Sequence, residues 1–215
     1  MATLLHIDSS LNGDNSASRA VTALFRETWQ SQHPEGRVIY RDLSAQPVPH
    51  VDAASYYAGF TPAEERTAAQ VESYALTEEL LREIESADAV LVGAPLYNFT
   101  VPSSLKAWID RIIAMGRTSG TENGTLAGKP VTVVTSRGGS YAEGTPQAGN
   151  DFLTPYLQHI FGTSLGMEVD FIVPELTLAP TVPAMAELIP LFEQSRERAH
   201  EEASSKAKAL AAKLS

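Results

Sequence analysis

The sequence predicts one α/β domain, with helices on both faces of a doubly wound, five-stranded parallel sheet. Two observations support this fold class. Short, continuous apolar runs alternate with longer amphipathic stretches, which is the succession of strands and helices in a parallel sheet. In addition, no linker, internal repeat or shift in composition divides residues 1–215, a length that one large domain accommodates.

Residues 89–113 form the clearest single unit: a buried strand, a sharp turn and a helix. The strand is the apolar run Ala89–Val92, which shows no alternation. The helix begins near Pro102, and its apolar positions recur at steps of three and four residues: Leu105, Trp108, Ile109, Ile112 and Ile113. Ligands of open α/β sheets bind beyond the carboxyl ends of the strands, where the uncharged, aromatic turn Gly93–Thr100 is placed. This turn favours a flat, weakly charged ring as its ligand.

Four further strands follow from the same apolar pattern, at Thr3–Asp8, Arg37–Leu43, Val131–Thr135 and Val169–Val173. Helices are expected after Ser18, from Thr61 to near Ser86, over much of Thr145–Gly166 and over Pro183–Ser215. At Thr61, Glu64 completes a capping box and Pro62 takes the first turn. In the C-terminal helix, Glu202 and Lys206 are expected to form an i, i+4 pair on a solvated face.

The loop after the first strand, Ser9–Ser18, is rich in hydroxyl groups and small residues. Gly13 can take a positive φ, and Ser16 or Ser18 is placed to cap the following helix. Free amides at that helix terminus, with the hydroxyl groups of Ser10, Ser16 and Ser18, form a candidate phosphate site. The alternative is that these serines only cap the helix and fill the turn, and this is the favoured interpretation when the loop is considered by itself.

A second group of small residues follows the fourth strand: Ser136, Arg137, Gly138 and Gly139. Adjacent glycines let backbone amides approach a ligand closely, although such a pair is also typical of a flexible turn. If the strand order is 2-1-3-4-5, the switch point lies between the first and third strands, and all three loops border one crevice. A phosphate site, an aromatic wall and a glycine floor fit FMN better than a dinucleotide, because no Gly-x-Gly-x-x-Gly follows the first strand.

The composition argues against several function classes. Asp and Glu number 26 against 16 Lys and Arg, and the net charge of -10 opposes binding to nucleic acid. Because the sequence has no cysteine, it has no thiolate nucleophile or thiolate metal site, and redox chemistry needs a cofactor. His6, His50 and His159 lack the spacing of metal ligands. Without a signal-peptide pattern or an apolar run of bilayer length, we expect a cytoplasmic protein that does not bind membranes.

Three motifs and a short downstream element resemble those of a known family. They are DSSLNGDNSAS at residues 8–18, APLYNFTVPSSLKAWIDRI at 94–112, TSRGG at 135–139 and TPYL at 154–157. Nearly the whole chain is similar to the FMN-dependent azoreductases and NAD(P)H:quinone oxidoreductases of the flavodoxin-like superfamily. The resemblance implies that the flavin phosphate lies against Ser10, Ser16, Ala17 and Ser18, and that the ring and ribityl chain lie against Pro95, Leu96, Tyr97, Asn98 and Phe99. It also places Ser136, Arg137, Gly138 and Gly139 at the pyrimidine edge.

The same resemblance implies an activity and an assembly. Two electrons pass from NADH or NADPH through FMN to a quinone or an azo compound, by two half-reactions that share one pocket. The cofactor carries the chemistry, so no catalytic side chain is expected. Members of the family are homodimers with each active site at the subunit boundary, and we expect a homodimer here.

Two departures from the family concern the substrate pocket. Some members have aromatic residues in the loop matching Arg117–Thr121 and at the position matching Thr163, so the preferred acceptor is left open. Arg117 either favours a negatively charged group or is only solvated. The connector Pro47–Phe60 is long for an α/β link, and its aromatic residues either cap a pocket, contact a partner subunit or, as we expect, pack on the domain's own surface.

Two other functions compete with the enzyme. A flavodoxin-type electron carrier would share the fold and the acidic surface, but it gains from an exposed flavin edge. The long connector, the segment Gly116–Pro130 and the extended C-terminal helix argue against such a carrier. The other rival is an α/β scaffold without a cofactor, which would be colourless even after FMN is added.

Overall fold

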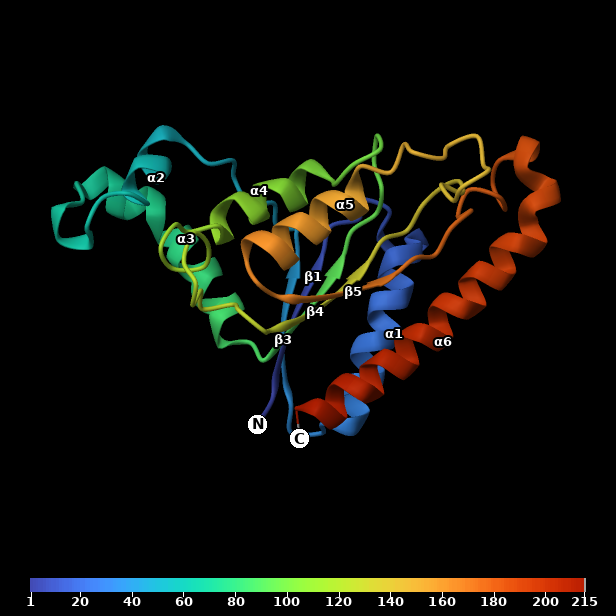
Figure 1. The fold of residues 1–215 in the computed structure, drawn as a ribbon, viewed down its shortest axis with the longest axis horizontal. Coiled ribbons are helices and arrows are strands. Elements are labelled where there is room, and N and C mark those ends of the chain that lie inside the picture. The colour runs from blue at the N-terminus through green and yellow to red at the C-terminus, as the bar shows by residue number, and fades with distance from the viewer. Residues whose placement is uncertain (215) are drawn as a thin grey trace.

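The computed structural model describes residues 1–214 and confirms the five-stranded parallel sheet. The strands are β1 (Thr3–Asp8), β2 (Arg37–Asp42), β3 (Ala89–Gly93), β4 (Pro130–Val134) and β5 (Glu168–Ile172). All neighbours are parallel, and the order is β2-β1-β3-β4-β5, as expected. The carboxyl ends of the strands therefore meet at one edge of the sheet, with the switch point between β1 and β3 (Figure 1).

Helices cover both faces of the sheet, which confirms the doubly wound architecture (Figure 1). Helices α1 (Ala17–Gln32) and α6 (Ile189–Lys213) pack together on one face. Helices α3 (Ala68–Ser86), α4 (Ser103–Ile112) and α5 (Leu153–Leu157) cover the other. No helix within residues 1–214 is long and apolar enough to cross a bilayer.

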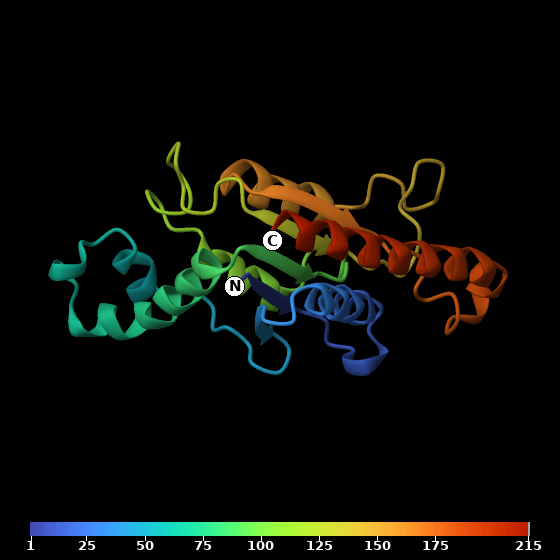
Figure 2. The same cartoon turned by 90° about the horizontal axis from the view of Figure 1, so that it is seen from below.

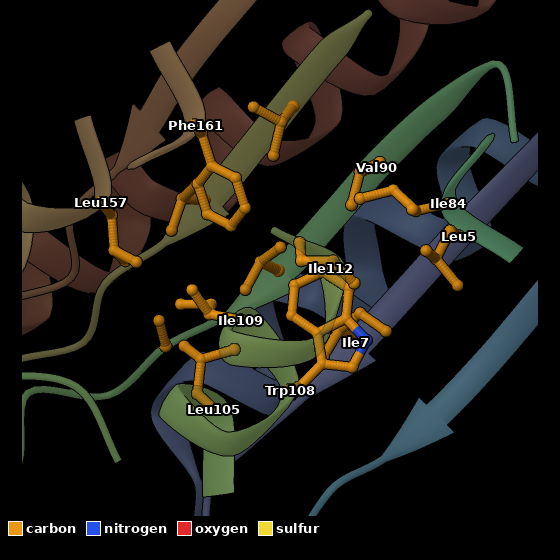
Figure 3. Close-up of a cluster of buried hydrophobic side chains, with 14 of the residues drawn as sticks. Leu5, Ile7, Ile84, Val90, Leu105, Trp108, Ile109, Ile112, Leu157 and Phe161 are labelled. Carbon is orange, nitrogen blue, oxygen red and sulfur yellow. The ribbon is translucent and has the colours of Figure 1, made fainter. Parts of the chain in front are cut away.

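The core lies in two layers because the buried strands face helices on both sides. On β1, Leu4 belongs to the layer under α1 and α6, whereas Leu5 and Ile7 belong to the layer under α3 and α4. Figure 3 shows the second layer, where the fully buried Trp108 of α4 lies close to Ile7. This burial on both faces explains why the strands appear in the sequence as continuous apolar runs.

The predicted start of α3 was wrong. The helix begins at Ala68, and its capping box is formed by Thr67 and Gln70 instead of Thr61 and Glu64. The hydroxyl group of Thr61 donates to the carbonyl oxygen of Tyr57 at 2.8 Å. Thr61 therefore ends the preceding turn instead of starting α3, and a short 3₁₀ turn over Ala63–Glu65 separates the two.

Two other expectations about helices need correction. Helical structure in Thr145–Gly166 begins only at Leu153, because Gly144 and Gly149 have φ of 83° and 82°, which a right-handed helix does not accept. Helix α5 continues into a π-helical turn over Gln158–Ser164. In the C-terminal segment, a 3₁₀ turn over Pro183–Leu188 precedes α6, and Ser215 lies outside the described residues. Lys206 pairs with Asp170 of β5 and not with Glu202, so this charge holds α6 to the sheet.

The connector after β2 contains a short helix, α2 (Ala53–Ala58), that the sequence did not predict. Figures 1 and 2 both show it at one end of the molecule, away from the sheet. Tyr56, Tyr57 and Phe60 are 56%, 62% and 61% exposed, so the expectation that they pack on the domain's own surface was wrong. The ring of Tyr56 contacts those of Tyr57 and Phe60, and the three side chains, with Met115, line a cavity of about 680 Å³.

Candidate functional site

The loops that follow β1, β3 and β4 are joined at the carboxyl edge of the sheet. Both the amide and the hydroxyl group of Ser9 donate to the carbonyl oxygen of Gly93, at 3.1 and 2.7 Å. On the other side, the amide of Leu96 donates to the carbonyl oxygen of Ser136 at 2.9 Å. The expected convergence of three loops at the switch point is therefore confirmed.

Tyr97 ties the loop after β3 to the loop after β1. Its hydroxyl oxygen lies 3.2 Å from the buried hydroxyl group of Ser10 and accepts a hydrogen bond from the amide of Leu11, also at 3.2 Å. The hydroxyl group of Ser10 accepts in turn from the amide of Asn12. The position of Ser10 thus depends on a side chain 87 residues away in the sequence.

The N-terminus of α1 forms the other half of the loop after β1. Ser16 is the N-cap: its hydroxyl oxygen accepts from the amide of Arg19 at 3.3 Å and lies 3.1 Å from the hydroxyl group of Ser18. Gly13 has φ of 49°, as expected for a tight turn. Ala17 and Ser18 are the first two residues of the helix, so no carbonyl four residues earlier accepts from their amides. Two hydroxyl groups and two helix-terminal amides are therefore gathered at one place.

The loop after β3 narrows to a strained two-residue turn. Tyr97 and Thr100 exchange two backbone hydrogen bonds of 3.0 Å, and the residues between them, Asn98 and Phe99, have φ of 47° and 70°. Left-handed values at both central positions are typical of a type I′ turn, and they are costly for phenylalanine. Within residues 1–214, the amides of Asn98 and Phe99 donate to no protein acceptor. Strain combined with free donors is typical of a ligand-binding turn.

The loop after β4 leaves free space beside the backbone of Gly139. A Cβ atom at Gly139 would meet no atom within 4 Å, whereas one at Gly138 would lie 2.7 Å from Leu178 Cδ1. Gly139 also has a free amide in the described chain, while its carbonyl oxygen accepts from the amide of Leu176 at 3.2 Å. Beside Gly139 lies a cavity of about 560 Å³, which extends to the start of α6.

Arg137 stands apart from the other predicted site residues. Its guanidinium group donates to Asp151 at 2.6 Å and to the hydroxyl group of Thr154 at 2.8 Å. Its amide donates to the carbonyl oxygen of Pro174 at 2.9 Å. Arg137 therefore fixes the loop after β4 to α5 and to the segment after β5, and neither its amide nor these side-chain donors are free for a ligand.

Comparison with known proteins identifies the relatives of this chain. Residues 2–206 match the family described by its flavodoxin-like fold. Over 215 residues the chain is 56% identical to a Streptomyces coelicolor protein named FMN-dependent NADH:quinone oxidoreductase. That match covers 100% of this chain and 97% of the Streptomyces protein. The chain belongs to the FMN-dependent NADH:quinone oxidoreductase family.

Two solved structures at lower sequence identity share the fold of this chain. An azoreductase from Bacillus anthracis superposes with a TM-score of 0.81 at 24% identity, covering 96% of this chain and 99% of that one. A second structure is an FMN-dependent NADH-azoreductase from Bacillus anthracis in complex with FMN. It superposes with a TM-score of 0.80 at 23% identity, and the match covers 98% of this chain and 100% of that one.

In this member of the oxidoreductase family, an unpredicted polar network lies directly under the loop after β1. Asp8, the last residue of β1, is buried and accepts hydrogen bonds from the hydroxyl groups of Thr22 at 3.0 Å and Tyr40 at 3.1 Å. Burial by itself raises the pKa of Asp8, but His6, Thr22 and Arg19 outweigh it and leave that pKa below its usual value. Burial and the charge of Asp8 raise the pKa of Tyr40 to about 12.

Gly93 explains how a buried carboxylate fits at the switch point. A Cβ atom at Gly93 would lie 2.4 Å from Asp8 Oδ1, so only glycine leaves room for the carboxylate. The sequence carried one signal of this network. Arg19 lies in the first turn of α1, where the helix dipole disfavours a cation, and carboxylates close to it offset this unfavourable interaction.

The alternative that Arg117 is only solvated was wrong. Its guanidinium group donates to Glu85 at 2.6 and 2.8 Å and to Glu78 at 2.9 Å, so it binds the loop Gly116–Pro130 to α3. Thr163 lies in the π-helical turn after α5.

Within residues 1–214 no three His, Asp or Glu side chains are arranged to hold a metal ion.

Proposed function

We propose that this protein is an FMN-dependent oxidoreductase that transfers two electrons from NADH or NADPH to quinones and azo compounds. One observation carries the proposal: three loops meet at the switch point and present hydroxyl groups, free amides, a strained aromatic turn and an open glycine. The names of the relatives, which include FMN, NADH and quinone, support the same activity.

The phosphate of FMN fits the loop after β1. Ser10, Ser16 and Ser18 supply three buried hydroxyl groups, and Ala17 and Ser18 supply amides at the positive end of the α1 dipole. These are donors that a phosphate accepts, and they are arranged where flavodoxin-like sheets bind their ligands. A dinucleotide would require a second phosphate site, which none of the three loops provides.

The ring of FMN fits the other two loops. Pro95 is buried under the loop after β3, and Leu96 and Tyr97 lead into the strained turn, so the aromatic wall is held rigidly. Free amides at Asn98, Phe99 and Gly139 are donors for the polar pyrimidine edge. Because Gly139 has no neighbour on its Cβ side, a flat ring can approach its backbone closely.

Bound FMN would accept a hydride from the nicotinamide and pass two electrons to the acceptor. The chain contributes binding and orientation: fixed amides near the pyrimidine edge stabilise negative charge there without reorganising. No side chain is needed as a general acid. The nicotinamide leaves before the acceptor enters the same pocket, so the kinetics are of the ping-pong type.

Steady-state turnover of the FMN-loaded protein tests this proposal. NADH and NADPH are each varied against a quinone and an azo dye, and the double-reciprocal lines are compared. Parallel lines are expected, because the two substrates alternate in one pocket. Intersecting lines would contradict the alternation, and no turnover with either donor would favour a flavodoxin-type carrier. A protein that stays colourless after FMN is added would instead be a scaffold without a cofactor.

We also propose that the protein is a homodimer and acts in the cytoplasm. The exposed aromatic side chains Tyr56, Tyr57 and Phe60, together with Met115 at 58% exposure, form an apolar surface suited to a second subunit. Sedimentation equilibrium should give twice the mass of the chain. A monomer at all concentrations would contradict the proposed dimer but not FMN binding.

A further inference from the structure

We propose that Arg19 is a positioning residue for phosphate recognition: it fixes the shape of the Ser10–Ser18 loop and so makes the site select a phosphorylated flavin. This inference rests on the proposed function, because it concerns how the phosphate of the cofactor is held. Arg19 is the third residue of α1 and directly follows the amides of Ala17 and Ser18. Its side chain reaches back over the loop that these amides terminate.

Arg19 joins the two ends of this loop. Its Nη2 and Nε atoms donate to the carbonyl oxygen of Ser10, at 2.8 and 3.3 Å. Between these ends, residues 11–15 are all exposed. Apart from the hydrogen bond from the amide of Leu11 to Tyr97, their backbone makes only local bonds, such as the turns from Asn15 to Asn12 and from Ser16 to Gly13. Together with Tyr97, Arg19 is therefore what holds Ser10 at a fixed distance from the helix terminus.

The sheet in turn holds the guanidinium group. Asp42, the last residue of β2, accepts from Nη2 at 2.6 Å and from Nη1 at 2.8 Å, a bidentate pair. Asp42 is in register with Asp8 of β1, and the hydroxyl oxygen of Tyr40 accepts from Nη1 at 3.1 Å. The position of the Ser10 carbonyl is thus set by two rigid strands through one planar side chain.

The charges around Arg19 show that it acts through Ser10 and not as a phosphate ligand. Asp42 pairs with it directly, and Asp8 Oδ2 lies 3.8 Å from Nη1. The hydrogen bond with Asp42 also raises the pKa of Arg19. Its positive charge is therefore compensated inside the chain, and its geometric role remains: the planar fork bridges a carbonyl and a carboxylate, which a lysine ammonium cannot do in the same way.

The test compares FMN with riboflavin, which lacks the phosphate. The apoprotein and its Arg19→Met and Arg19→Lys variants are titrated with each flavin by calorimetry. We expect Kd for FMN to rise about tenfold in both variants, the equivalent of about one hydrogen bond to a charged group, while Kd for riboflavin stays unchanged. Arg37→Met is the matched control, because Arg37 is exposed at the opposite end of β2.

Several results would overturn the inference. Equal weakening of FMN and riboflavin would show a general structural effect, and full FMN affinity in Arg19→Lys would show that charge alone suffices. If Arg19→Met fails to fold, Arg19→Lys and Asp42→Asn make the same comparison. Wild-type protein that binds neither flavin would refute the proposed function itself, whereas wild-type binding with unaffected Arg19 variants would refute only the role of Arg19.

Discussion

At the residue scale, the hydroxyl group of Tyr97 joins two loops, because Ser10 and Leu11 both contact it. We predict that Tyr97→Phe raises Kd for FMN about fivefold, since one net hydrogen bond contributes about 1 kcal/mol. Calorimetric titration of the apoprotein measures this change.

The matched control for this variant is Tyr74→Phe. Tyr74 lies on α3, and no other described residue hydrogen-bonds its hydroxyl group. Unchanged FMN affinity in Tyr97→Phe, or an equal loss in both variants, would contradict the bridging role of Tyr97.

A substitution at Gly139 tests whether the free space beside its backbone holds the flavin ring. The φ of Gly139 is not in the left-handed region, and a Cβ atom there meets no neighbour, so Gly139→Ala should leave the melting temperature of the apoprotein unchanged. The added methyl group should nevertheless weaken FMN and riboflavin alike by about tenfold, because it occupies the space of the ring. Thermal unfolding and flavin titration give the two readouts.

The contrasting variant is Gly93→Ala. Its Cβ atom would lie 2.4 Å from Asp8 Oδ1, so the fold itself should lose stability. If Gly139→Ala behaved like Gly93→Ala and destabilised the apoprotein, the open space at Gly139 would not be a ligand site.

Residue types explain which candidate site residues the sequence predicted. Serines before a helix and paired glycines after a strand indicate amide and hydroxyl donors, and Ser10 and Gly139 lie where this pattern predicts. Side-chain destinations were not predictable, because they depend on contacts distant in sequence. Arg137 donates to Asp151 and Arg19 to Asp42, and neither spacing is a local motif.

At the scale of elements, strands were easier to predict than helix starts. A strand covered on both faces must be apolar throughout, so β3 appears in the sequence without ambiguity. Capping patterns are short and recur by chance: Thr61 with Glu64 and Thr67 with Gln70 both satisfy the rule. Only the tertiary position of the chain decides between them, and it selects Thr67.

We predict that Thr67→Ala lowers the free energy of unfolding by about 1 kcal/mol, because it removes the N-cap of α3. Glu64→Ala should change that free energy by less than about 0.5 kcal/mol, as expected for an exposed residue outside the cap. Urea unfolding of both variants makes the comparison. A larger effect of Glu64→Ala would restore Thr61 as the start of the helix.

At the scale of the whole molecule, ion pairs join α1 to β2 and the loop Gly116–Pro130 to α3, and they set the response of the fold to acid. Hydrogen bonds from Arg19 and Arg117 hold the pKa of Asp42 and of Glu85 below their usual values of 3.8 and 4.5. A carboxylate with a lowered pKa stabilises the fold above its unfolded pKa, and this stability is lost as the pH falls through the lower folded value. We therefore predict that the free energy of unfolding falls below about pH 4.5.

In the variant Arg117→Met, the free energy of unfolding should fall less steeply as the pH decreases, since Glu85 then titrates nearly as it does in the unfolded chain. Lys106→Met is the control, because Lys106 belongs to an exposed pair with Asp110 on α4. Urea unfolding between about pH 7 and about pH 3 gives the slope of the free energy of unfolding against pH for each variant. An identical slope for wild type and Arg117→Met would contradict the assignment.

We propose above that three loops from one sheet edge hold a single FMN, through which electrons pass from a nicotinamide to a quinone. Anaerobic stopped-flow absorbance tests it most directly: FMN-loaded protein is mixed first with NADH or NADPH and then with a quinone. We expect the oxidised-flavin absorbance to disappear with the nicotinamide alone and to return with the quinone. Flavin absorbance that persists with both nicotinamides, in the absence of a partner reductase, would contradict it.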